Sequence, residues 1–132
     1  MTHAQSIALF KSLGVQMTPE LKTPEVAMPH KGMSQRQYAT KMIEEYTQAG
    51  VPAHDVWPQS FNHADVVHWI NTHPDFASQS VFLDGRDEIT AFDPTDAATW
   101  SPTMNELVQQ GVEIIAPPIW MLLTLDDEAN IV

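Results

Sequence analysis

Two residues of opposite charge, Glu20 and Lys22, lie two positions apart in a segment that is predicted to be a short strand. Apolar and polar side chains alternate over 15–22, and this period of two places both charged groups on one face. At the carboxyl end of a strand in a parallel α/β barrel, an inward carboxylate and ammonium are costly unless they are used. The pair is therefore a candidate site, and the alternative is an edge strand whose polar face meets water.

Helices and strands are predicted to alternate around this segment. The helices, marked by apolar spacing and capping residues, are expected over 3–13, 34–50, 62–73 and 101–111. Further strands are expected over 55–61, 80–83 and 112–115. This order predicts an α/β fold with parallel strands, which a doubly wound sheet and a (β/α) barrel both satisfy. No predicted strand leads into the glycine-rich turn of a dinucleotide-binding fold, and the sequence has no P-loop.

Composition limits the partners. The 17 Asp and Glu against 6 Lys and Arg give a net charge of -11 at pH 7, and such a field repels nucleic acid and anionic membrane surfaces. A bound divalent cation can reverse the field locally, so an anionic substrate stays possible. No apolar run approaches the ~20 residues of a membrane span. We expect no nucleic-acid partner and no membrane span, and the compartment stays open.

The remaining metal-ligating residue types do not form a recognisable site in the sequence. His63, His68 and His73 are spaced by five, which on a helix turns each about 140° from the last, so they do not converge on one ion. The acidic residues from Asp84 to Asp96 lack the EF-hand pattern and are predicted to form a solvated loop.

Four segments, in order, resemble strands of the bacterial glycerophosphodiester phosphodiesterase family. Met17–Lys22 is similar to the family's P-E-[IL]-K strand, and Trp57–Phe61 is similar to the Q-S-F strand that follows it. Val81–Asp84 and Gly111–Pro118 are similar to the next two strands. The resemblance spans nearly the whole chain and implies a partial TIM-type (β/α)8 barrel of about four βα units with parallel strands.

The resemblance also implies an activity, the hydrolysis of glycerophosphodiesters to glycerol 3-phosphate and an alcohol. It makes Glu20 a ligand of a divalent cation, Ca²⁺ or Mg²⁺, and Lys22 the catalytic group that stabilises charge on the phosphoryl oxygens. Gln59, Ser60 and Trp120 are expected to contact the substrate.

The chain departs from this family in what it lacks. The family's His-Arg-Gly strand, its Glu-x-Asp metal pair and its second catalytic histidine lie upstream of the P-E-L-K strand, so the chain is expected to be a single partial domain over 1–132. It would then cover roughly strands four to seven of eight and be inactive unaided. One alternative is a non-catalytic half barrel that dimerises or docks through its open edges. Another is a metal-assisted aldolase, in which borohydride would trap a Schiff base on Lys22.

Overall fold

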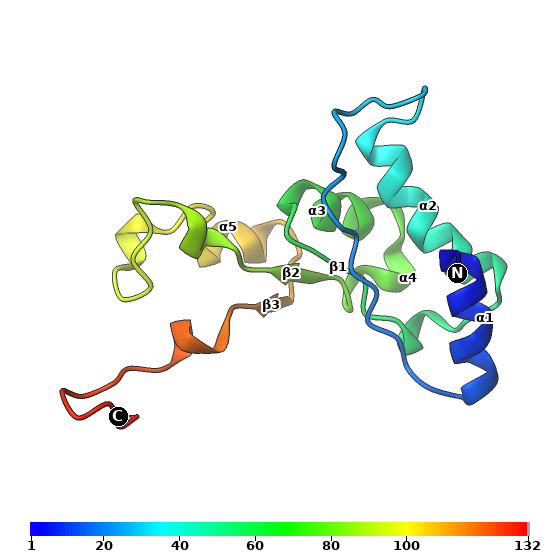
Figure 1. Cartoon of the computed structure of the whole chain (residues 1–132). Coiled ribbons are helices and arrows are strands. Elements are labelled where there is room, and N and C mark those ends of the chain that lie inside the picture. Colours follow the sequence, from blue (N-terminus) through cyan, green and yellow to red (C-terminus); the bar gives the residue numbers. More distant parts are fainter. Residues whose placement is uncertain (132) are drawn as a thin grey trace.

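The computed structural model describes residues 1–131, and over these the chain forms five α-helices and three β-strands. The helices are α1 (His3–Leu13), α2 (Gln35–Gln48), α3 (His63–Thr72), α4 (Pro74–Ala77) and α5 (Met104–Gln109). The strands are β1 (Gln59–Ser60), β2 (Val81–Leu83) and β3 (Ile114–Ala116). Figure 1 colours them along the chain and shows α1 and α2 at one end of the molecule and the C-terminus at the other.

The predicted helix starts at 3, 34 and 62 are confirmed, whereas α5 begins at Met104, later than the predicted 101; each of these starts rests on local hydrogen bonds. The Ser34 hydroxyl accepts the Gln37 N–H at 3.2 Å, and the Gln37 side chain accepts the Ser34 N–H at 2.8 Å, which together form a capping box. Thr103 and Glu106 form the same arrangement at α5. Asn62 caps α3, and Gly14 ends α1 with φ 66°, in the left-handed region.

The sheet is parallel, in the order β1-β2-β3. Gln59 pairs with Val81, and Val81 pairs with Ile114, so the three strands share one register row. The segment 17–21 runs beside β1 in the same direction. It is joined by two isolated parallel bridges, Met17 to Val56 and Glu20 to Gln59.

The predicted partial (β/α)8 barrel is wrong. Among the described residues the sheet has three strands of two or three residues, and four βα units are not formed. The expected strand over 15–22 is reduced to two bridges, and that over 55–61 to the two residues of β1. Pro19 and Pro58 interrupt the two segments, and each lacks the N–H that a ladder needs.

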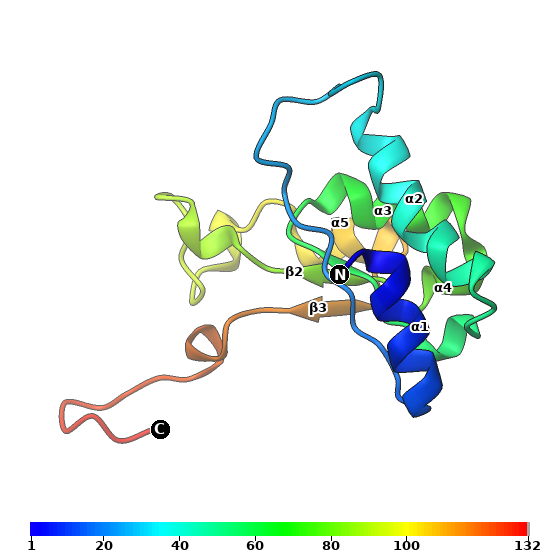
Figure 2. The ribbon, with the colours of Figure 1, turned by 45° about the vertical axis from the view of Figure 1, so that its right-hand side comes forward.

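The core lies between α2 and α3 and where α3 packs against β1 and β2, and Figure 2 shows α2 and α3 close to each other with α3 next to β2. Trp69 of α3 is fully buried, and its indole N–H donates to the Ala39 carbonyl of α2 at 3.0 Å. Ile43 of α2 and Phe82 of β2 belong to the same cluster of buried side chains. This core fixes β1 and, through the two bridges, the segment that carries Glu20.

Beyond β3 the chain leaves the core. Residues 117–131, here termed the C-terminal arm, extend away from the helices and the sheet in both views (Figures 1 and 2). The arm contains one 3-10 turn, Ile119–Leu122, and a single antiparallel bridge between Leu125 and Ile131. Several large apolar side chains are therefore exposed there, among them Ile119 at 73% and Leu122 at 68%.

Candidate functional site

The charged residues predicted from the sequence are in direct contact. Lys22 Nζ lies 2.9 Å from Glu20 Oε1, which is an ion pair. The Lys22 side chain is 76% exposed and the Glu20 side chain is 22% exposed, so the carboxylate is partly shielded while the ammonium reaches solvent. The pair thus sets a largely exposed ammonium beside a partly shielded carboxylate on a chain of net charge -11.

Gln59 accompanies this pair. The bridge between Glu20 and Gln59 sets the two residues side by side on adjacent parallel segments, and Gln59 is half-buried. Side chains on the same rung of neighbouring strands point to the same face. The structure therefore groups Glu20, Lys22 and Gln59.

The other two predicted substrate contacts do not join the group. Ser60 is buried, and its hydroxyl donates to the Leu21 carbonyl at 3.3 Å and accepts the Asn62 N–H at 3.0 Å. It follows Gln59 on a strand and therefore faces the opposite side. Trp120 lies in the C-terminal arm, apart from the segment of Glu20 in both views (Figures 1 and 2).

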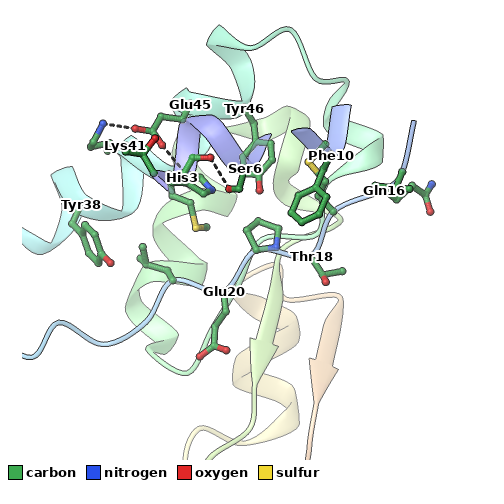
Figure 3. Close-up of a pocket in the computed structure, with 16 residues that line it drawn as sticks. His3, Ser6, Phe10, Gln16, Thr18, Glu20, Tyr38, Lys41, Glu45 and Tyr46 are labelled. Carbon is green, nitrogen blue, oxygen red and sulfur yellow. Dashed lines mark hydrogen bonds and ion pairs between the residues drawn. The ribbon is translucent and has the colours of Figure 1, made fainter. Parts of the chain in front are cut away.

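Glu20 also borders a cleft of about 860 Å³ between α1, α2 and the segment 15–21. Figure 3 shows Glu20 at one end of this cleft and a cluster of His3, Lys41 and Glu45 at the other. His3 Nδ1 lies 2.6 Å from Glu45 Oε2, and Lys41 Nζ donates to Glu45 Oε1. The sequence gives only the i,i+4 spacing of Lys41 and Glu45 as a sign of this cluster, and His3 joins it from another helix.

The electrostatics of this cluster favour a charged Glu45. The hydrogen bond from Lys41 is the main reason that the pKa of Glu45 is lowered, against the opposing effect of burial. Burial raises the pKa of the adjacent Tyr46 to about 12. Tyr46 therefore stays neutral at physiological pH, and its ring packs edge-on against His3 with centroids 5.2 Å apart.

The residues present do not by themselves fit a Ca²⁺ or Mg²⁺ ion. In residues 1–131 there is no group of three or more His, Asp or Glu side chains that could hold a metal. Glu20 offers one carboxylate, and one of its oxygens already binds Lys22. Hard divalent cations take six or more oxygen ligands, so the predicted ligand is at most one of a set.

A second cavity, of about 450 Å³, lies where β1 and β2 end. Phe61, His63 and Arg86 line it, and the His63 ring packs against Phe82 with centroids 5.2 Å apart. His63 Nε2 is buried and has no hydrogen-bond partner among the described residues. Burial lowers the pKa of His63 below its ordinary value of 6.5, so the folded chain favours the neutral ring.

We expect His63 to make stability depend on pH. Because its pKa is lower in the folded chain, the unfolded chain binds the proton more tightly, and stability is lost as pH falls below about 6.5. The free energy of unfolding of His63→Gln should fall less than that of wild type between about pH 7.5 and pH 5.5. Urea unfolding measures this, with His54→Gln, at a side chain that is 80% exposed, as control. Equal pH slopes in wild type and His63→Gln would contradict the assignment.

The loop after β2 is organised by a buried ion pair, so the prediction of a fully solvated loop is wrong for its first residues. Asp84 and Arg86 are 1% and 4% exposed. The Arg86 Nη2 and Nε atoms donate to the two Asp84 carboxylate oxygens at 2.6 and 2.8 Å. The guanidinium faces Phe92 and Trp100, at 5.2 and 5.5 Å from the ring centroids. In the sequence, the only sign of this ion pair is the Asp-x-Arg spacing of Asp84 and Arg86, with two aromatic residues later in the loop.

The described residues contain no helix that is both long and apolar enough to cross a membrane.

Comparison with known proteins gives one relative. The chain is 38% identical, over 133 aligned positions, to a protein of Arthroderma benhamiae that is named only as an extracellular protein. The match covers 100% of this chain and 53% of the relative, so the chain spans about half the length of the protein it matches. No family model matches the chain, and no solved structure matches it.

Proposed function

We propose that this chain supplies the phosphate-binding part of a site that hydrolyses glycerophosphodiesters, with Lys22 as the group that contacts the phosphoryl oxygens. The observation that carries the proposal is the Glu20–Lys22 ion pair beside Gln59. The resemblance of Met17–Lys22 and Trp57–Phe61 to glycerophosphodiester phosphodiesterases supports the substrate class.

The chemistry of the three side chains suits a phosphate ester. The ammonium of Lys22 donates to phosphate oxygens as a mobile point charge. Glu20 positions that ammonium through the 2.9 Å contact, and the Gln59 amide can donate to an ester or glycerol oxygen. On a chain of net charge -11, an exposed cation such as Lys22 favours anion binding because it offsets the surrounding field locally.

We do not propose that this chain alone hydrolyses glycerophosphodiesters. The resemblance places the general acid and base in segments that this sequence does not match, and the described residues hold no set of metal ligands. We therefore assign no step to a cation, and Ca²⁺ or Mg²⁺ dependence stays a prediction from the resemblance. It is tested by adding either ion to the titration described next, in wild type and in Glu20→Gln.

Glycerol 3-phosphate is expected to bind wild type more tightly than Lys22→Met. A hydrogen bond to a charged group is worth about 1.5–3 kcal/mol, so the dissociation constant should rise about tenfold or more. Isothermal titration calorimetry measures the change. Lys31→Met is the matched control, because Lys31 is an exposed lysine in the 28–33 loop. Equal affinities of wild type and Lys22→Met would show that this site does not bind the phosphate.

The name of the relative supports an extracellular location. We propose that the chain acts outside the cell, because the protein of Arthroderma benhamiae to which it is 38% identical is named an extracellular protein. Detection of the native protein in culture medium, with a cytoplasmic enzyme as a lysis control, tests this location.

A second candidate function, from a different class, is self-association without catalysis. The apolar side chains of the C-terminal arm favour it, because Ile119, Leu122 and Leu125 are each more than half exposed. Sedimentation equilibrium and the titration with glycerol 3-phosphate together distinguish the two functions. A chain that forms a concentration-dependent dimer and binds no phosphate ester would leave only self-association.

A further inference from the structure

The chain exposes more surface than its mass requires. Its accessible surface is 8530 Å², whereas a folded monomer of 14.8 kDa exposes about 7000 Å². The excess is about 1500 Å² per chain, and covering it in a pair of chains would bury about 3000 Å². Permanent homodimers bury about 2000–5000 Å², so the excess is of the size that a second copy covers.

Part of this excess lies in the C-terminal arm. The arm is apolar from Ile119 to Leu125 and becomes acidic at Asp126, Asp127 and Glu128. Leu123 has an extended backbone, with φ -126° and ψ 140°, and is 40% exposed, while Leu125 is 58% exposed. An extended apolar segment that stands away from its own core is suited to pair with a strand edge elsewhere.

Such an edge exists along the segment 16–20. Met17 exchanges hydrogen bonds with Asp55 and Trp57 at 2.8 Å, and the Pro19 carbonyl accepts the Gln59 N–H at 2.9 Å. The alternate residues Gln16, Thr18 and Glu20 make no backbone hydrogen bond within the described residues. Their N–H and C=O groups therefore form a free edge of the kind to which a further strand adds.

The cleft beside this edge can receive apolar side chains. Phe10, Met42 and Tyr46 line it together with Met17, and Figure 3 shows Phe10 and Tyr46 on the same side as Thr18. Phe10 is 42% exposed, so part of the lining meets solvent in the isolated chain. Strand addition combines backbone hydrogen bonds at an edge with pockets for alternate side chains.

We propose that two copies of this chain form a dimer in which residues 122–125 of each arm dock beside the segment 16–20 of the other copy. This inference rests on the self-association proposed above and names the surfaces that mediate it. Exchange of both arms gives a closed two-fold dimer, because each copy presents the same arm and the same edge. Leu123 or Leu125 enters the cleft, and the free groups at Thr18 gain partners.

Sedimentation equilibrium at about 0.15 M salt, which screens the repulsion between two acidic chains, tests the proposal. Wild type should form a dimer, and Leu122→Asp/Leu125→Asp should be monomeric at concentrations where wild type is dimeric. These residues lie outside the core, so circular dichroism should show the variant folded. Leu13→Asp, at an exposed residue of α1, is the control and should dimerise.

Cysteine cross-linking identifies the docked segments, since the chain has no cysteine of its own. Under mild oxidation, a mixture of Thr18→Cys and Leu123→Cys chains should give a covalent dimer of the two different variants. Ser12→Cys, at an exposed residue outside the cleft, mixed with Leu123→Cys should not. A monomeric wild type would refute both the self-association and the inference. A dimer that survives the arm variant and does not cross-link from Thr18 would refute only the inference.

Discussion

The variant Asp84→Ala is expected to lower the free energy of unfolding by about 3–5 kcal/mol. Asp84 accepts three hydrogen bonds from Arg86, two from the guanidinium and one from the backbone N–H at 3.1 Å. Removing the carboxylate leaves a guanidinium that is 4% exposed without its counter-charge. The loop 84–102 should loosen as well, because Arg86 Nη1 also donates to the Pro102 carbonyl.

Urea unfolding followed by circular dichroism measures this loss. The double variant Asp84→Ala/Arg86→Met should cost less than Asp84→Ala alone, since it removes the uncompensated charge along with its partner. Glu88→Ala, at an exposed carboxylate of the same loop, should change the free energy by less than about 0.5 kcal/mol. A loss for Asp84→Ala no larger than that for Glu88→Ala would show that the ion pair is not buried in solution.

The variant Trp69→Ala should also cost about 3–5 kcal/mol, through the cavity that it leaves between α2 and α3. Trp69 is the largest fully buried side chain of the described residues. It also satisfies the Ala39 carbonyl through its indole N–H, and this bond is lost with the ring. Trp69→Phe keeps part of the volume without the donor and should fall between wild type and Trp69→Ala.

Leu13→Ala gives the comparison for Trp69→Ala, because it also truncates a large apolar side chain on a helix but at a residue that is 62% exposed. Its expected change is below about 0.5 kcal/mol. Similar urea midpoints for Trp69→Ala and Leu13→Ala would contradict the packing of α3 on α2.

The helices could be predicted from the sequence because their signals are local. Ser34 with Gln37, and Thr103 with Glu106, fix helix starts within four residues of chain, and no distant contact is needed. The strand over 15–22 could not be predicted in the same way. Its period of two was correct, but pairing depends on N–H groups facing a neighbour, and Pro19 has none to give.

The candidate site was predictable in part for the same reason. Glu20 and Lys22 share a face by period alone, and the structure places them in contact. Gln59 and Ser60 could not both face that site, because consecutive strand residues point to opposite faces, and Ser60 is the one turned inward. Arg86 pairs with Asp84 and faces the rings of Phe92 and Trp100. These contacts depend on how the loop folds, and they produce no periodic pattern from which the sequence could predict them.

A nuclear magnetic resonance titration of the ¹⁵N-labelled chain with glycerol 3-phosphate tests most directly whether Lys22, together with Glu20 and Gln59, binds a phosphate ester. We expect the largest amide shift changes to fall on Glu20, Lys22 and Gln59 and to disappear in Lys22→Met. Shift changes confined to the His3, Lys41 and Glu45 cluster, or no saturable change at all, would contradict this expectation.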